Sequence, residues 1–267
     1  DYHTRLPVRG KDEIALMAEH FNRMEEQVES HIKLLQETAD KKQQFVDNFA
    51  HELRTPLTAI YGYAEYLQKA PATEKELFEC TQFILSECSR LQNMAYQLLD
   101  LAALREFKTE ACEVDHLFRR VHEIMQIKAE KSGISLSFSG SGEHVIGNME
   151  LLITLLSNLI DNAFKASAGG SAVRIRAERK EDKVILEVED QGIGMTREQI
   201  SHIKEAFYRV DKSRSRAAGG AGLGLSICER IVGLHGGSLE FISEPGRGTV
   251  AQAILPGGEE ETGFTTS

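Results

Sequence analysis

The sequence lacks several features that would assign it to common protein classes. Its four cysteines, Cys80, Cys88, Cys112 and Cys228, show no CxxC or CxxH spacing, which argues against a zinc site or a disulfide framework and suits a reducing compartment. No apolar run approaches the roughly 18–20 residues that span a bilayer, and no signal peptide is recognised, so we expect a soluble chain.

Basic residues are also in deficit. The net charge is −10 and the pI is about 5.5, which argues against nucleic acid as the main partner, because binding to a phosphate backbone needs a basic face. With 267 residues, 41% of them hydrophobic, the chain is long enough for one or two globular domains.

A histidine within a long predicted helix is the first candidate functional residue. Apolar residues recur every fourth position at Phe45, Phe49, Leu53 and Leu57. This spacing indicates a helix whose apolar stripe faces a core, and His51 lies off that stripe. Pro56 removes a backbone donor and its ring crowds the carbonyl of Glu52, so we expect a bend within about one turn of His51.

The same helix is predicted to begin much earlier, at Asp12, after a polar connector over residues 1–13. Its apolar residues fall at steps of three or four: Ile14, Met17, Phe21, Met24, Val28, Ile32 and Leu35. The spacing favours a coiled-coil seam. An ordinary amphipathic helix on a globular core is the alternative.

A second helix follows a break at residues 68–73. Thr73 and Glu76 form the pattern of a capping box at its start. Two sets of positions repeat every seven residues: Leu77, Ile84, Leu91 and Leu98, with Thr81, Cys88, Ala95 and Ala102 beside them. We predict an antiparallel helical hairpin that cannot bury its stripes alone, so two copies should pair into a four-helix bundle, which makes the protein a homodimer.

Beyond about residue 105 the pattern mixes helices with alternating strands. Strands are predicted at 108–114, 134–139, 172–180, 183–189, 238–244 and 249–255, and helices at 115–131, 148–167 and near 222–235. This mixture predicts an α/β sandwich with one helical layer on one sheet. The last dozen residues look frayed.

Three polar motifs in this second half could bind a nucleotide. Asn158, Asn162 and Lys165 share one helix face, where amide oxygens suit Mg²⁺ and an amine suits polyphosphate. Asp190, before Gly192 and Gly194, could accept a bond from the exocyclic amine of adenine.

A glycine-rich segment at 219–224 is the third motif, and it opens a helix whose free N–H groups suit phosphate. Each motif alone has a plainer explanation: a solvated helix face, an ordinary Asp-Gly turn or a flexible loop.

Taken together, the motifs resemble a known family. His-Glu-x-x-Thr-Pro at 51–56 resembles the phosphoacceptor box of bacterial sensor histidine kinases. The three motifs, in this order, resemble the nucleotide-binding boxes of the GHKL ATPase superfamily. Residues 207–214 resemble its F box and ATP lid, and residues 246–249 its last glycine box. The resemblance covers residues 12–255.

The resemblance implies an ATP-dependent protein histidine kinase. His51 would take the γ-phosphate of ATP, Glu52 would hold the other ring N–H, and phosphate would pass to an aspartate of a response regulator. Thr55 would serve a phosphatase activity on that regulator. Asn158 would ligate Mg²⁺, and the implied ATP site comprises Asn158, Asn162, Lys165, Asp190, Gly192, Gly194, Tyr208, Arg209, Arg214, Gly220, Gly222, Leu223, Gly224 and Thr249.

Residues 12–24 resemble the second helix of a HAMP linker. This implies the cytoplasmic portion of a membrane protein, attached only through upstream segments. The predicted divisions are a HAMP end and signalling helix at 1–37, a dimerisation and phosphotransfer domain at 38–106, an ATP-binding domain at 107–257 and a tail at 258–267.

Three positions depart from the family pattern. Ala166 replaces a frequent aromatic residue, Lys204 a usual phenylalanine and Ala206 a usual arginine, which bears on lid packing and ATP affinity. Two alternatives therefore stay open: a dimeric scaffold with a degenerate nucleotide site, and a GHKL-class ATPase of another kind.

Overall fold

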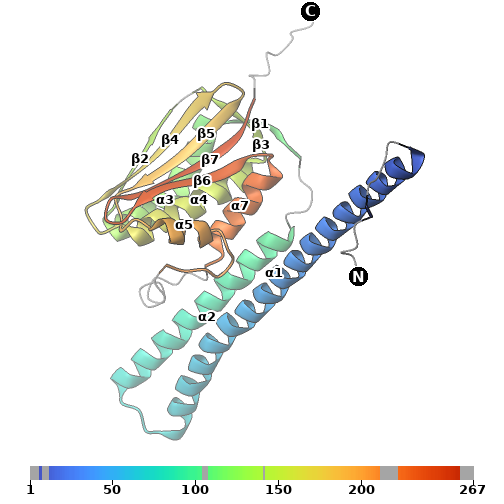
Figure 1. Cartoon of the computed structure of the whole chain (residues 1–267). Coiled ribbons are helices and arrows are strands. Elements are labelled where there is room, and N and C mark those ends of the chain that lie inside the picture. The colour runs from blue at the N-terminus through green and yellow to red at the C-terminus, as the bar shows by residue number, and fades with distance from the viewer. Residues whose placement is uncertain (1–5, 8–11, 104–107, 141, 211–221, 259–267) are drawn as a thin grey trace, which may run out of the picture. The chain divides into compact units, whose positions relative to one another are not determined.

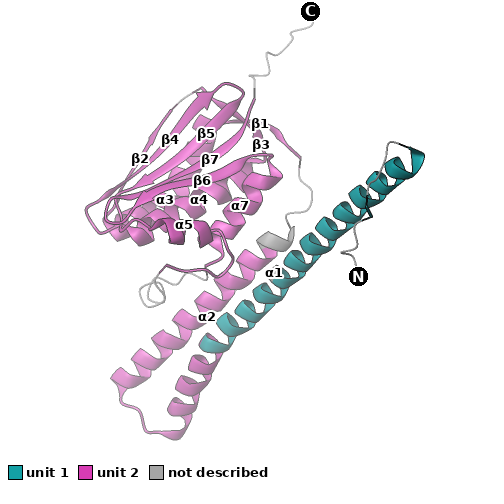
Figure 2. Ribbon diagram, viewed as in Figure 1, with its two compact units in different colours: residues 1–55 teal, residues 56–267 magenta. Residues whose placement is uncertain are grey.

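The computed structural model describes residues 6–7, 12–103, 108–140, 142–210 and 222–258 (Figure 1). The chain divides into two compact units, residues 1–55 and 56–267 (Figure 2). The boundary falls inside a helix, between Thr55 and Pro56.

The long N-terminal helix α1 spans Glu13–Lys69, as predicted from its apolar spacing. It begins where the side chain of Asp12 accepts a hydrogen bond from the backbone N–H of Ala15, at 3.0 Å, which satisfies one of the free donors of the first turn. The helix continues through Pro56 without a break. The part of α1 up to Thr55 makes up most of the described portion of the first unit.

Helix α2, Glu74–Ala103, confirms the predicted second helix. Its capping box is complete: Thr73 N–H donates to Glu76 Oε2 at 2.8 Å, and Glu76 N–H donates to Thr73 Oγ1 at 3.3 Å. The end of α1 packs on α2 through Tyr63 and Phe83, whose ring centroids are 4.4 Å apart. The helical hairpin is therefore closed by a capped turn and an aromatic contact.

An α/β sandwich makes up the rest of the second unit. Its strands are β1 (Glu110–Glu113), β2 (Ser135–Ser139), β3 (His144–Gly147), β4 (Ala172–Lys180), β5 (Lys183–Asp190), β6 (Ser238–Glu244) and β7 (Gly248–Gly258). Its helices are α3 (Val114–Ser132), α4 (Met149–Ala166), α5 (Arg197–His202) and α7 (Gly224–Leu234). The strand order is β1-β3-β7-β5-β4-β2, with β6 also paired to β7. The fold class predicted from the sequence is confirmed.

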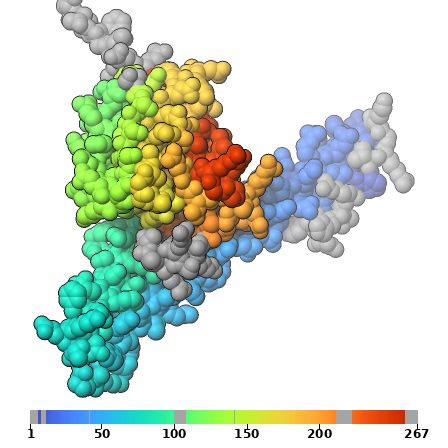
Figure 3. Space-filling view, turned by 90° about the vertical axis from the view of Figure 1, so that its left-hand side faces the viewer, coloured from blue at the N-terminus to red at the C-terminus, as the bar shows by residue number. Residues whose placement is uncertain are grey.

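The sheet is covered by helices on one face (Figure 1). Strand residues alternate, and the inward set is buried or half-buried together with the apolar side of α4. Representative core residues are Leu152, Leu155, Leu156, Ile160, Ile175, Leu186 and Ala253. Strand β2 pairs with β4 in parallel, the one parallel pair among the described strands, and Figure 3 shows the green and yellow parts of this unit side by side.

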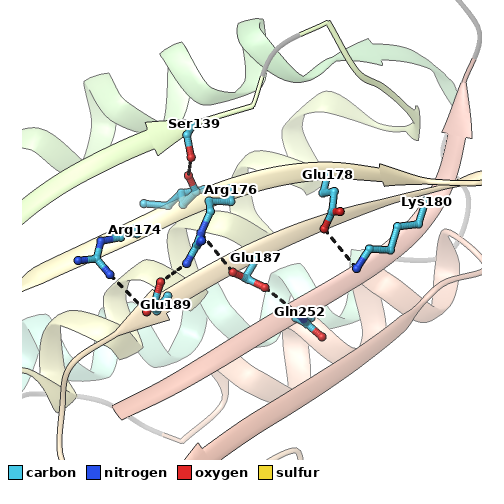
Figure 4. Close-up of polar contacts among 9 residues, drawn as sticks. Ser139, Arg174, Arg176, Glu178, Lys180, Glu187, Glu189 and Gln252 are labelled. Atoms are coloured by element: carbon cyan, nitrogen blue, oxygen red, sulfur yellow. Dashed lines mark hydrogen bonds and ion pairs between the residues drawn. The ribbon is translucent and has the colours of Figure 1, made fainter. Parts of the chain in front are cut away.

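The other face of the sheet carries a polar network (Figure 4). Arg174 lies 3.4 Å from Glu189, and Arg176 contacts both Glu189 and Glu187. Gln252 donates to Glu187 at 2.8 Å. Cross-strand pairs of opposite charge stabilise neighbouring strands modestly, and they keep this face hydrophilic.

Two short elements were not predicted. Strand β3 has four residues between a glycine turn and the N-cap of α4, too few to show an alternating pattern. Helix α5 has six residues and buries none of its side chains, so it lacks an apolar stripe. Its capping box, Thr196 with Gln199, was the signal that could have revealed it.

The predicted frayed tail is shorter than expected, since β7 runs to Gly258 and the backbone N–H of Gly257 bonds the Asp182 carbonyl at 2.8 Å. The remainder of that predicted tail lies outside the described residues. Within the described ranges, none of the helices combines the length and apolar character needed to cross a bilayer.

Candidate functional site

A cavity of about 660 Å³ opens where the C-terminal half of α4, the segment after β5 and the segment after α5 meet β6 and β7. This volume lies in the range of small-molecule sites. Most of the predicted ATP residues line it: Asn158, Asn162, Lys165, Asp190, Gly192, Gly194, Tyr208, Arg209, Gly222, Gly224 and Thr249. The fold thus gathers motifs spread over some ninety residues of sequence.

Helix α4 presents two amides to this cavity. The Nδ2 of Asn158 donates to the carbonyl of Thr154 at 2.9 Å, which fixes the rotation of the amide. Its Oδ1 then lies against Gly224, 3.0 Å from where a Cβ at that glycine would be. The Nδ2 of Asn162 is buried with no hydrogen-bond partner among the described residues. A buried amide donor left unpaired is costly, so this atom indicates a place for a ligand.

The third residue of the motif, Lys165, is held by a carboxylate. Its Nζ lies 2.7 Å from Asp161 Oδ2, and Lys128 of α3 contacts the other oxygen of Asp161. Burial by itself raises the pKa of Asp161, but the two lysines outweigh it and hold that pKa below its ordinary value. Lys165 thus lines the cavity, and its positive charge is partly neutralised by the ion pair with Asp161.

Asp190 ends strand β5 and is 8% exposed. Its Oδ1 accepts the backbone N–H of Gly192 at 2.7 Å. Burial raises the pKa of Asp190, although backbone N–H groups of Gly192 and Thr249 lower it in part. A buried carboxylate with a fixed rotamer and remaining acceptor capacity can select a donor on a ligand, as reading an exocyclic amine requires.

The glycines after Asp190 permit close backbone contacts. A Cβ at Gly192 would lie 2.5 Å from the Ala166 carbonyl oxygen, the atom that accepts the backbone N–H of Ile193 at 3.2 Å. Gly194 has a φ of +63° and packs against the Glu244 carbonyl. Larger residues at these positions would move the segment that carries Asp190 away from α4.

The wall opposite α4 includes residues 208–210, before the segment 211–221, and Gly222 and Gly224 after it. The backbone N–H of Phe207 donates to the Gly222 carbonyl at 2.8 Å, and both residues have positive φ, +67° and +75°. Helix α7 begins two residues later at Gly224, so its N-terminus borders the cavity, as anion binding requires. Leu223, predicted at the ATP site, is fully buried in the core and does not line the cavity.

Several lining residues were missed by sequence reasoning, among them Ile193, Met195, Ile203, Phe241 and Ala251. Phe241 and Ala251 are register partners on β6 and β7. The sequence predicted only the two strands, and strand pairing decides that these two residues meet the cavity. Ala166 also lines it, where the family pattern often has an aromatic ring.

The remaining predicted site residues lie elsewhere. His51, Glu52 and Thr55 are on α1 in the first unit, where His51 is exposed and Glu52 half-buried. Arg214 and Gly220 lie outside the described residues.

The donor set fits Mg²⁺ but not a metal held by protein alone. No group of three His, Cys, Asp or Glu side chains suited to a metal occurs in the described part of the chain. Mg²⁺ usually keeps several waters and takes one or two protein oxygens plus phosphates. The fixed Oδ1 of Asn158 at the cavity wall is such an oxygen.

Comparisons with known proteins match both the helical hairpin and the α/β sandwich. The model described as His Kinase A (phospho-acceptor) domain matches residues 41–107, and the model described as histidine kinase-, DNA gyrase B- and HSP90-like ATPase matches residues 147–259. The sensor histidine kinase MtrB of Mycobacterium tuberculosis is 34% identical over 259 residues, which cover 94% of this chain and 46% of MtrB. The chain spans about half the length of the curated relatives it matches.

Two solved structures share the fold. Full-length ShkA in complex with AMPPNP is 25% identical, with a TM-score of 0.59, covering 82% of this chain and 46% of ShkA. The histidine kinase ThkA, solved in complex with the response regulator protein TrrA, is 24% identical, with a TM-score of 0.68, covering 80% of this chain and 61% of ThkA.

The two family models together match more than half of the chain, and they occur in the order helical hairpin, then α/β sandwich. The phospho-acceptor match contains His51, and the ATPase match contains both asparagines and Asp190 at the cavity. On the basis of these two matches and of the sensor kinase relatives, this chain belongs to the sensor histidine kinases of two-component systems.

Proposed function

We propose that this chain binds Mg-ATP in the α4 cavity, phosphorylates His51 and passes the phosphoryl group to an aspartate of a response regulator. The observation that carries the proposal is the cavity itself. Both the buried carboxylate of Asp190 and the amide of Asn162, whose Nδ2 has no hydrogen-bond partner among the described residues, line it. ShkA, which shares the fold at 25% identity, was solved with the ATP analogue AMPPNP.

The chemistry at His51 requires an accessible, neutral imidazole. His51 is exposed on α1, so its ring nitrogens are accessible to a nucleotide phosphate. One ring nitrogen attacks the γ-phosphorus in line, the bond to the β–γ bridging oxygen breaks, and ADP leaves with that electron pair. The proton on the other ring nitrogen passes to Glu52, one residue along the helix.

The cavity residues have separate roles in this proposal. Asp190 accepts a hydrogen bond from the adenine amine, and Lys165 with the N-terminus of α7 binds phosphate oxygens. Asn158 ligates Mg²⁺, which would neutralise charge on the transferring phosphoryl group. Arg209 lines the cavity and adds positive charge there, and we assign the same part to Arg214.

A second copy of the chain is the proposed partner of the helices. Along α2, Phe78, Leu85 and Leu99 repeat at seven or fourteen residues and are 64%, 59% and 64% exposed. Along α1, Ile14 and Met17 are 74% and 72% exposed. Regular apolar stripes of this kind are covered in a helical bundle. The phospho-acceptor match supports a homodimer of this type.

We keep the predicted domain divisions as part of the proposal: 1–37, 38–106, 107–257 and 258–267. A response regulator is the second proposed partner, and the phospho-acceptor match supports it. The resemblance of residues 12–24 to a HAMP linker supports a cytoplasmic portion attached to a membrane through segments upstream.

Incubation with γ-labelled ATP tests the proposal and separates it from both alternatives. Wild type should acquire an acid-labile label, because phosphohistidine hydrolyses in acid. His51→Gln should acquire none, whereas His31→Gln, an exposed histidine on the same helix, should label like wild type. ATP hydrolysis without labelling would instead indicate another GHKL-class ATPase, and absence of ATP binding would indicate a degenerate scaffold.

A further inference from the structure

Lys204 joins three segments of the cavity wall through one ammonium group. It lies two residues after α5. Its Nζ is 3.0 Å from Glu229 Oε2 on α7, and it also donates a hydrogen bond to the carbonyl of Leu239 on β6. Lys204 and Leu239 are 35 residues apart in the sequence, and the side chain of Lys204 is 34% exposed.

Each of the three segments contributes directly to the cavity. Ile203, next to Lys204, lines it, as do Gly224 at the start of α7 and Phe241 on β6. Phe241 is two residues after Leu239, so both side chains lie on the same face of β6. Lys204 itself does not line the cavity. It therefore contacts these segments on a side that does not face the cavity.

The buried apolar side chain in this part of the wall is that of Ile203, which is 5% exposed, whereas Ile200, Phe207 and Tyr208 are half-buried. Helix α5 buries none of its side chains, and Ile203 is the buried residue that follows it. Lys204 also stands where the family pattern usually has phenylalanine. In this chain a polar bridge to Glu229 and the Leu239 carbonyl occupies that position.

We propose that Lys204 is a positioning residue for ATP, which holds the segment 203–210 against α7 and β6 through Glu229 and the Leu239 carbonyl. The inference rests on the proposed function of the cavity and adds a residue that determines its affinity. Because Glu229 is 46% exposed, salt screens the ion pair. The affinity for ATP should therefore fall as ionic strength rises.

The test compares three variants with wild type and a control. Lys204→Met keeps the aliphatic stem and removes the charge, Lys204→Arg keeps the charge, and Glu229→Gln removes only the ion pair. Lys180→Met is the matched control, since Lys180 forms an exposed pair with Glu178, 3.2 Å apart, away from the cavity. The measurements are the Kd of ATP, the KM and kcat of autophosphorylation, and the thermal unfolding of the nucleotide-free chain.

We expect Lys204→Met to raise the Kd and KM for ATP about threefold to tenfold with kcat at saturating ATP unchanged, as loss of a partly exposed pair and one charged hydrogen bond implies. Glu229→Gln should raise the Kd about twofold and make its salt dependence weaker than that of wild type, because the remaining dependence comes from the cationic groups that bind phosphate. Lys204→Arg and Lys180→Met should bind ATP within about twofold of wild type.

Unchanged ATP affinity in both Lys204→Met and Glu229→Gln would overturn the inference, as would a lower unfolding temperature with no change in Kd. If Lys204→Met does not fold, Glu229→Gln alone decides. Failure of the wild-type chain to bind ATP is a different result, because it removes the proposed function itself.

Discussion

The hydroxyl of Thr55 donates a hydrogen bond to the backbone carbonyl of His51, 3.3 Å away and one turn earlier in α1. Both side chains are exposed, and residues four apart share a helix face. The hydroxyl hydrogen is directed into the helix, so the oxygen of Thr55 keeps lone pairs that face solvent beside His51. This arrangement suits accepting a hydrogen bond from a water molecule.

We predict that Thr55 assists dephosphorylation of the regulator. A water that donates to Thr55 keeps a lone pair for attack on the phosphoaspartate of a docked regulator. Thr55→Ala should keep autophosphorylation and transfer but slow dephosphorylation about tenfold or more, at least roughly 1.4 kcal/mol. The rate is followed as loss of label from phosphorylated regulator mixed with each variant and ADP.

Thr55→Ser is the control for that experiment, because it keeps the hydroxyl and should keep most of the rate. Equal rates for wild type and Thr55→Ala would remove Thr55 from the mechanism. Loss of autophosphorylation as well would mean that the substitution had disturbed the helix before Pro56.

Asp190→Asn should weaken ATP binding by roughly 10- to 150-fold, the equivalent of about 1.5–3 kcal/mol for a charge-assisted hydrogen bond. The shape of the side chain and its bond from Gly192 N–H are kept, so the cavity should stay intact. Equilibrium binding of ATP to the purified chain measures the effect. Unchanged affinity would place the adenine subsite elsewhere.

The same variant should stabilise the nucleotide-free chain at neutral pH. Burial raises the pKa of Asp190, so its contribution to the free energy of unfolding is fully present below the pKa of an unfolded aspartate, about 3.9, and is lost as pH rises through the folded pKa. We expect the melting temperature of Asp190→Asn to exceed that of wild type by about 2 °C at pH 7.5, and by less at pH 4.5. An equal difference at both values would contradict this reasoning.

Asn158→Ala should remove Mg²⁺-dependent activity while ATP binding without Mg²⁺ changes little, because the lost oxygen is a proposed metal ligand. Titration of MgCl₂ in the autophosphorylation assay measures this. Asn148→Ala is the matched control on α4: it removes the N-cap bond to Leu151 N–H and should cost about 1 kcal/mol of stability. An identical Mg²⁺ dependence in wild type and Asn158→Ala would exclude the ligand role.

A fragment of residues 38–106 should dimerise by itself, because the exposed apolar residues of α2, Phe78, Leu85 and Leu99 among them, need a partner surface. Sedimentation equilibrium at micromolar concentration gives its mass. Leu85→Glu should shift the fragment towards monomer, whereas Lys75→Glu, at an exposed position near the start of the helix, should not. A monomeric wild-type fragment would contradict the bundle.

The sequence alone determined the order of domains and most of the elements. The apolar spacing of α1 and α2, the capping box at Thr73 and the alternation of β4 and β5 are local patterns, and local patterns follow from hydrogen bonding and periodicity within a few residues. The same holds for the asparagines of α4, which share a helix face by their spacing.

Only the tertiary structure decided which segments meet. Phe241 and Ala251 reach the cavity because β6 pairs with β7 in one register, and Lys204 meets Glu229 and Leu239 because α5, α7 and β6 pack at the same corner. The seven-residue repeat predicted the stripe that begins at Leu77. In the structure of a single chain, the most exposed large apolar residues described on α2 are instead Phe78, Leu85 and Leu99, each one position after a residue of that stripe. Contacts of this kind join residues that no local period relates, since they depend on how separate elements pack.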